Sequence, residues 1–260
     1  MKVELYFNAL QTDELQFRDR VVVVIDVLRA GTTIATALLN GAKEIIPVTS
    51  VESAVKMGTN LFGDVTLLGG ERNAKTIEGF NLGNSPLEYT EHVVKGKSII
   101  FHSSNGSQAV LKGRHAKRVV LAAFVNISRV VDFLLGTGAQ IALLCAGRST
   151  DGFSLEDTLC GGMIVSKLLE KAEQVEFTDS SLMALTLYKN FGKNILKALR
   201  TSEHGRYLTD LGFEDDIKLC AGVDTVPVLP TLEGSVIRRL KTARGRTKKL
   251  RSRHTVRAGS

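Results

Sequence analysis

The 260-residue chain has little cysteine and histidine, and this limits the chemistry open to it. Its three cysteines, Cys145, Cys160 and Cys220, are widely spaced and form no C-x-x-C pair, so we expect reduced thiols rather than a disulfide framework. The five histidines are scattered, which argues against a Cys/His metal cluster. Any functional site must therefore depend mainly on other side chains.

Long apolar runs are also missing. No run approaches the ~20 residues needed to cross a bilayer. The first residues, MKVELYFNALQTDEL, carry acids where a signal peptide needs an apolar core. A composition of 43% hydrophobic and 23% charged residues is ordinary for a globular protein. These features predict a cytoplasmic protein that makes no membrane contact.

Acidic residues are absent from residues 238–260, which contain ten Lys or Arg. The whole chain carries a net charge of +7, but without these ten residues 24 basic side chains face 27 acidic ones, a net charge of −3. No Pro/Ser-rich linker divides the rest. We therefore expect one domain over residues 1–237 and a basic, disordered tail over 238–260. Weak nucleic-acid binding through this tail and a tail with no partner both remain open.

Apolar segments with strand and helix patterns alternate through the first 170 residues. This order predicts an α/β fold, with a largely parallel sheet, helices on both faces in three layers, and a helix-rich C-terminal part. The expected strands are 3–7, 21–26, 44–48, 65–68, 98–102, 119–122, 140–145 and 225–229. The expected helices are 32–39, 51–57, 105–112, 126–135, 155–170, 181–199 and 203–211.

The segment from Val21 to Ala42 is the most informative. Its first five residues are all β-branched, as in a strand buried on both faces. Asp26 and Arg29 follow, and then a helix begins. Open α/β sheets bind ligands at this position, although a helix cap with a charged neighbour is the simpler alternative.

Two further turns carry polar groups after predicted strands. The segment Gly69–Pro86 is long and rich in Gly and Asn, as in a shaped binding loop, and it begins with Glu71 and Arg72. These two side chains could instead pair with neighbours. The segment His102–Val110 places Ser104, Asn105 and Gly106 at a helix start, where backbone amides attract anions, or where they simply cap the helix.

The fourth polar turn lies within Cys145–Gly162. Arg148 follows a predicted strand, and Ser154 with Asp157 matches a helix-capping pattern. A cysteine-phosphatase loop is excluded because it needs a wider spacing than the two residues between Cys145 and Arg148. A haloacid-dehalogenase nucleophile is excluded because no second Asp follows Asp26 at the required position.

Together these turns supply carboxylates and guanidinium groups to the ends of separate strands. Carboxylates without His or Cys ligands suit a hard cation such as Mg²⁺. Arginines suit planar recognition of phosphate, sulfonate or carboxylate groups. We therefore expect an anionic substrate and a Mg²⁺ ion.

At these residues the chain resembles the 2-phosphosulfolactate phosphatase family. The resemblance runs from about residue 2 to about residue 237 and includes the strings VIDVLRAGTTIATAL, GGERN, GFNLGNSP, SSNGSQA, FSLEDTLCGG and SEHGRYLTDLGFEDDIKLCAGVDTVPVL. It implies a Mg²⁺-dependent phosphatase that converts 2-phospho-3-sulfolactate to 3-sulfolactate and phosphate on the route to coenzyme M. The family motif positions are Asp26, Arg29, Glu71, Arg72, Asn81, Ser104, Asn105, Gly106, Arg148, Glu156, Asp157, Cys160, His204 and Asp224.

We expect Asp26 and Glu71 to bind the metal. Asp26 and Asp157 are expected to be catalytic, with Asp157 transferring protons. The anionic substrate is expected to contact Arg29, Arg72, Arg148 and the turn formed by Ser104, Asn105 and Gly106. Three alternatives remain open: a phosphatase of another small anionic organic phosphate, a nucleic-acid-binding protein acting through its tail, and a non-catalytic anion sensor. The oligomeric state is also open, and a homodimer is one arrangement.

Overall fold

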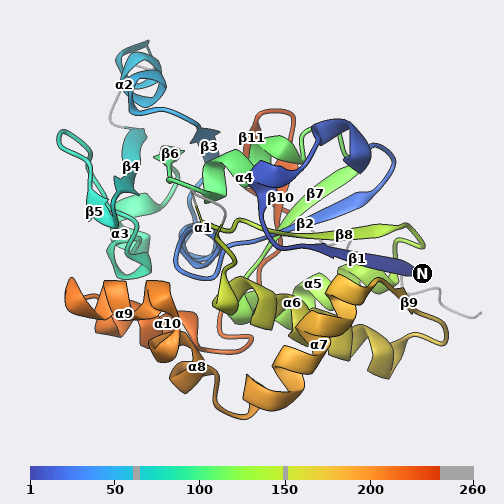
Figure 1. Ribbon diagram of the computed structural model, residues 1–260. Coiled ribbons are helices and arrows are strands. Elements are labelled where there is room, and N and C mark those ends of the chain that lie inside the picture. The colour runs from blue at the N-terminus through green and yellow to red at the C-terminus, as the bar shows by residue number, and fades with distance from the viewer. Residues whose placement is uncertain (61–64, 149–151, 241–260) are drawn as a thin grey trace, which may run out of the picture.

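The computed structural model describes residues 1–60, 65–148 and 152–240 (Figure 1). Within these ranges, no helix combines the length and the apolar character that a membrane crossing requires. The strands are β1 (Lys2–Tyr6), β2 (Val21–Ile25), β3 (Glu44–Val48), β4 (Thr66–Arg72), β5 (Lys75–Thr76), β6 (Ser98–His102), β7 (Arg118–Ala122), β8 (Ile141–Cys145), β9 (Glu176–Phe177), β10 (Pro230–Glu233) and β11 (Val236–Arg239). The α-helices are α1 (Ala30–Leu39), α2 (Val51–Asn60), α3 (Glu91–Val94), α4 (Gly106–Lys112), α5 (Ile127–Leu135), α6 (Leu155–Lys171), α7 (Asp179–Phe191), α8 (Ile195–Thr201), α9 (Glu203–Asp210) and α10 (Glu214–Cys220).

Strand β2 is buried on both faces, as its sequence predicts. All five of its residues are buried. Val21, Val23 and Ile25 join one apolar core with side chains from α5, α6 and the later helices. Val22 and Val24 join a second core with side chains from α1 and α4. Because successive strand residues point to opposite faces, this alternation confirms a sheet between two helical layers.

The sheet is largely parallel, and an antiparallel hairpin interrupts it. Its strand order is β5-β4-β6-β3-β11-β10-β7-β2-β8-β1-β9. Strands β4, β6 and β3 form one parallel block, and β7, β2, β8, β1 and β9 form another. The hairpin β10–β11 joins the blocks through three antiparallel pairings, so the blocks run in opposite directions along the ladder.

Two predicted elements are wrong in detail. Residues 225–229 form no strand, because Pro227 lacks an amide donor and Val226 donates to the Val125 carbonyl outside any ladder. Strand β10 begins instead at Pro230. The single helix predicted over 181–199 is broken by a short 3₁₀ turn, Gly192–Asn194, and Asn194 caps α8 by accepting from the Lys197 amide.

The predicted boundary between domain and tail falls inside strand β11, which ends at Arg239. Arg238 pairs with Glu44 of β3, so the first residues of the predicted tail belong to the sheet. The remainder of that tail, 241–260, lies outside the described residues.

The C-terminal part is helix-rich, as predicted. Helices α8, α9 and α10 follow one another below β5 and α3 in Figure 1. Asp216 of α10 anchors them: its Oδ2 accepts from Arg29 Nη1 at 2.6 Å and its Oδ1 accepts from Ser85 Oγ at 2.6 Å. These contacts hold the helical unit against the segments that follow β2 and β5.

Candidate active site

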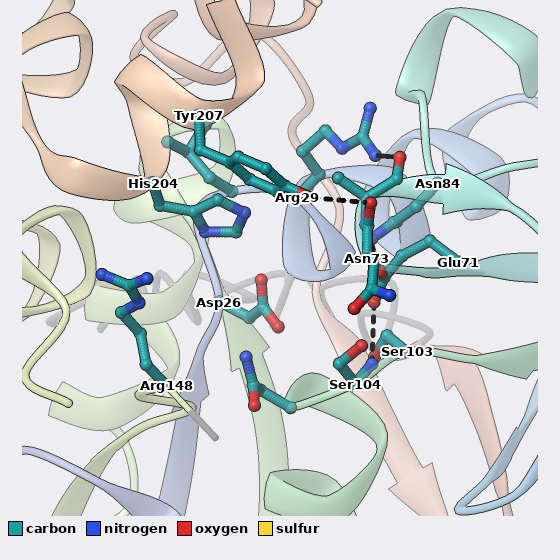
Figure 2. Close-up of a pocket in the computed structure, with 13 residues that line it drawn as sticks. Asp26, Arg29, Glu71, Asn73, Asn84, Ser103, Ser104, Arg148, His204 and Tyr207 are labelled. Carbon is teal, nitrogen blue, oxygen red and sulfur yellow. Dashed lines mark hydrogen bonds between the residues drawn. The ribbon is translucent and has the colours of Figure 1, made fainter. Parts of the chain in front are cut away.

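Polar side chains from three parts of the chain meet in one cavity of ≈ 230 Å³ (Figure 2). The segments that follow β2 and β8 form one wall, β4 and the segments after β4 and β6 form a second, and α9 forms a third. The lining residues are Asp26, Leu28, Arg29 and Arg148 on the first wall, Glu71, Asn73, Ala74, Asn84, Ser103, Ser104 and Asn105 on the second, and His204 and Tyr207 on the third. We call the first two walls together the sheet wall, and we call the third wall, formed by α9, the helical wall.

Asp26 lies at the carboxyl end of β2, where its sequence position predicts. Its Oδ1 accepts a hydrogen bond from the Ala30 amide at 3.0 Å, which fixes the carboxyl at the start of α1. Burial raises the pKa of Asp26 to about 6, although nearby His204 acts in the opposite direction. A Cβ at Gly106 would lie 2.4 Å from Asp26 Oδ2, so only glycine lets α4 begin this close to the carboxyl.

Glu71 joins two loops of the sheet wall. Its Oε2 accepts from the Ala74 amide and its Oε1 accepts from the Ser104 amide, each at 2.8 Å. The first bond closes the turn after β4, and the second ties that turn to the segment after β6. Each carboxylate oxygen has a further lone pair, so these bonds do not prevent Glu71 from binding a cation.

Two amide oxygens of the cavity lining, Asn84 Oδ1 and Asn105 Oδ1, are buried and have no hydrogen-bond partner among the residues that the structure describes. A buried unpaired acceptor is unfavourable unless a donor or a cation satisfies it. Among the described residues, no group of three or more His, Cys, Asp or Glu side chains could hold a metal. A cage of carboxylates alone is therefore not present there, but Mg²⁺ commonly binds one or two carboxylates together with neutral oxygens and water. The donor set fits such an ion.

The three candidate arginines have different environments. Arg29 lines the cavity but is buried, since its guanidinium pairs with Asp216, donates to the Ala74 carbonyl at 2.7 Å and lies 4.1 Å from the Phe213 ring centre. Arg148 also lines the cavity, where it pairs with the exposed Glu203. Arg72 lies outside the cavity and lines an adjacent hollow with Lys75. Arg148 is the best placed of the three to meet an anion.

The turn that was predicted to bind an anion lies at the cavity, and some of its backbone amides already donate hydrogen bonds within the protein. Ser104 and Asn105 line the cavity, and Gly106 begins α4 beside Asp26. The Ser104 amide donates to Glu71, and the Ser107 amide donates to Ser103 Oγ at 2.9 Å. Its role in substrate binding stays a prediction.

Asp157 lies behind the cavity rather than in its lining. It is buried, and its Oδ1 accepts from the Val27 amide at 2.9 Å. Burial, with the nearby charges of Asp26 and Glu156, raises the pKa of Asp157 well above its usual range. These contacts hold the turn after β2, and the expected role in proton transfer stays a prediction.

The three thiols are all buried, as free cysteines. Burial raises the pKa of Cys145, Cys160 and Cys220, so none is an activated thiolate. This agrees with the absence of a phosphatase cysteine loop in the sequence.

The helical wall brings a histidine that sequence reasoning placed in the family motif without giving it a role. His204 Nδ1 lies 3.6 Å from Oε1 of the buried Glu156. Three residues further along α9, Tyr207 donates its hydroxyl to the Asn73 carbonyl at 3.1 Å. Their spacing places both side chains on one helix face, a signal that could have pointed to Tyr207.

Two other motif positions have structural contacts away from the cavity. Asn81 Oδ1 accepts from the Leu68 amide at 2.8 Å. Asp224 accepts from the amide and the hydroxyl of Ser128, each at 2.6 Å, at the start of α5. Both side chains therefore fix loops of the fold.

Comparisons with known proteins agree with this arrangement. The family model of 2-phosphosulpholactate phosphatase matches residues 7–235. A probable 2-phosphosulfolactate phosphatase of Caldanaerobacter subterraneus subsp. tengcongensis is 40% identical over 239 residues, which cover 92% of this chain and 98% of the relative.

Two further relatives carry the same name. The protein of Symbiobacterium thermophilum is 42% identical over 219 residues, covering 84% of this chain and 94% of the relative. That of Clostridium botulinum strain Alaska E43 is 36% identical over 240 residues, covering 92% and 100%. The match includes both walls of the cavity, and the chain belongs to the 2-phosphosulfolactate phosphatase family.

Proposed function

We propose that this chain is a Mg²⁺-dependent phosphatase that hydrolyses 2-phospho-3-sulfolactate to 3-sulfolactate and phosphate, a step on the route to coenzyme M. One observation carries the proposal: in a member of this family, carboxylates, two arginines, a histidine and amide oxygens without a partner among the described residues line a single cavity. This set of groups suits a small substrate with a phosphate and further anionic groups.

Phosphate monoesters are among the slowest compounds to hydrolyse in water, so their cleavage requires strong stabilisation of charge on the phosphoryl oxygens. Arg148 supplies a guanidinium at the cavity and can bind a phosphate, sulfonate or carboxylate oxygen. Arg29 acts indirectly, because its hydrogen bonds to Asp216 and to the Ala74 carbonyl hold the cavity wall in place. Anion binding thus falls mainly to Arg148.

Asp26 and Glu71 are the proposed metal ligands, with the Asn84 and Asn105 amide oxygens as neutral donors beside them. A bound Mg²⁺ ion would neutralise developing phosphoryl charge and lower the pKa of coordinated water. The backbone bonds to Asp26 and Glu71 keep both carboxylates in place before substrate arrives. The protein therefore contributes a preorganised set of oxygen ligands.

The test is phosphate release from synthetic 2-phospho-3-sulfolactate by the full chain, with Mg²⁺ or with EDTA. We expect turnover with Mg²⁺, its loss in EDTA and its recovery on adding excess Mg²⁺. Undiminished turnover in excess EDTA would contradict the metal assignment. No release from this substrate, with release from other small phosphates, would show a different substrate for the same chemistry.

A further inference from the structure

The helical wall offers one imidazole ring to the cavity. His204 extends from α9 into the space between Tyr207 and Arg148 in Figure 2, with Asp26 across from it. Its Nδ1 is on the Glu156 side, 3.6 Å from Oε1, so Nε2 is the nitrogen left for a ligand. The side chain is 27% exposed, whereas that of Glu156 is 4% exposed.

Glu156 lies where it can orient the His204 ring. It lies in the first turn of α6 and is buried, and a buried carboxylate needs a compensating partner. Burial is the largest single influence and raises the pKa of Glu156, but the contacts with His204, with its own backbone amide and with Ser202 together outweigh burial and leave the pKa below its usual value. The ionised carboxylate therefore fixes the ring orientation and favours a proton on Nδ1.

The other groups of the lining are less suited to giving a proton to a substrate. Tyr207 already donates its hydroxyl to the Asn73 carbonyl. Asp26 and Glu71 are assigned to the cation, Arg148 is assigned to the anionic substrate, and Arg29 pairs with Asp216. Asp157 is turned toward the Val27 amide behind the lining. Among the described cavity residues, this leaves His204.

We infer that His204, oriented by Glu156, is the general acid that protonates the leaving alcohol oxygen. The inference rests on the proposed phosphatase activity and deepens it. The oxygen of water forms a bond to phosphorus as the bond from phosphorus to the bridging oxygen breaks. The leaving electron pair takes the proton from Nε2 of the doubly protonated imidazole, which yields the neutral alcohol and leaves His204 neutral, with its remaining proton on Nδ1 facing Glu156. One proton of the water stays on the phosphate, the other passes to solvent, and His204 regains a proton from solvent.

The test compares two leaving groups. An alkoxide such as that of sulfolactate needs a proton, whereas 4-nitrophenolate leaves readily without one. We expect His204→Gln to lower kcat for 2-phospho-3-sulfolactate by about 10²–10⁴-fold, the usual contribution of general acid catalysis. For 4-nitrophenyl phosphate we expect less than a tenfold loss, and unchanged KM for both substrates.

Glu156→Gln should give the same pattern with a smaller loss, and adding it to His204→Gln should cause little further loss because the two act as a unit. His115→Gln, at an exposed histidine remote from the cavity, serves as the control with no expected change. Melting temperatures verify that each variant is folded. Added imidazole should restore part of the alkyl-phosphate rate of His204→Ala.

Equal losses on the two substrates, or full activity of His204→Gln on the alkyl phosphate, would overturn this inference and leave the phosphatase proposal intact. Absence of phosphate release by the unaltered chain from either substrate would overturn the proposed function, and the inference with it.

Discussion

The sheet wall and the helical wall of the cavity are held by different kinds of contact. On the sheet wall, main-chain amides fix the carboxylates: Ala30 donates to Asp26, while Ala74 and Ser104 donate to Glu71. These groups sit at strand ends whose positions the ladder determines. Main-chain hydrogen bonds therefore hold the carboxylates of the sheet wall in place in the absence of a ligand.

The helical wall is attached by side-chain contacts between distant parts of the chain. Arg29 pairs with Asp216 across 187 residues, and Tyr207 donates to the Asn73 carbonyl across 134 residues. The difference implies that the two walls have different functions. The sheet wall supplies fixed ligands for charge, and the helical wall supplies the proton donor and closes the cavity.

The largest expected effect comes from breaking the attachment of the helical wall. Arg29→Met leaves Asp216 buried without its ion-pair partner and should lower the free energy of unfolding by about 3–5 kcal/mol. Urea denaturation measures this. Arg200→Met, which breaks the exposed pair with Glu214, is the matched control and should cost about 1 kcal/mol or less. Equal losses in the two variants would contradict the anchoring role of Arg29.

The next largest effect is expected from a substitution that adds one methyl group to the sheet wall. Gly106→Ala would place a Cβ 2.4 Å from Asp26 Oδ2, so the carboxyl must move. We expect kcat/KM to fall by about 10²-fold, since displacements near 1 Å have effects of this size. Gly136→Ala, where the nearest atom to the added Cβ is at 3.5 Å, should leave kcat/KM unchanged. An active Gly106→Ala enzyme would show that the position of Asp26 matters little.

The next effect distinguishes an arginine that lines the cavity from one that lies outside it. Arg148→Met should raise KM by about 10–100-fold, through the loss of a charge-assisted hydrogen bond to an anion. Arg72→Met, in the adjacent hollow, should change KM by less than about threefold, in the range of surface substitutions. If KM rises equally in both, Arg72 binds substrate as the sequence suggests, and the functional cavity extends into the hollow.

In the absence of metal, the ionised carboxylate of Asp26 should also lower the free energy of unfolding. Its pKa of about 6 in the folded protein exceeds the ordinary value of 3.8, so the native state favours the protonated carboxyl. Stability from this group is present below pH 4 and is lost as the pH rises through about 6. Asp26→Asn should thus melt higher than the unaltered chain at pH 7.5, with the gain vanishing near pH 4. A constant difference across that range would contradict the raised pKa.

The smallest effect concerns the C-terminal end. A chain ending at Leu240 retains β11 and the contact of Arg238 with Glu44, so kcat/KM and melting temperature should be unchanged. A chain ending at Gly234 lacks β11, which joins the two parallel blocks, and should lose stability. If truncation after Leu240 reduces kcat/KM, residues 241–260 contribute to the cavity.

The sheet wall was largely predictable from sequence, and the helical wall was not. The run of β-branched residues before Asp26 marks a strand end, and Glu71, Ser104 and Arg148 also lie at or just after the ends of strands. Local pattern carries this information because an apolar run followed by polar or Gly residues marks where a strand ends. The meeting of these residues in one cavity depends in addition on the hairpin β10–β11, which joins two blocks of opposite direction.

The burial of Arg29 and the displacement of Arg72 could not be predicted. Arg29 is buried by Asp216 and Phe213, which are far away in the chain. Arg72 belongs to β4, which continues beyond the predicted strand 65–68, so its side chain and that of Glu71 point to opposite faces. The hairpin at β10–β11 was missed for a related reason. Its strands pair with β7 and β3, while the preceding segment around Val226 has a strand-like pattern but fills a small core instead.

Titration of Mg²⁺ into the chain by calorimetry at pH 7.5, with and without Asp26→Asn, tests the central claim most directly: the carboxylates of the sheet wall form a cation site. We predict saturable binding by the unaltered chain and an affinity at least about tenfold lower for Asp26→Asn. Equal affinity in the two proteins, or no binding by either, would contradict the claim.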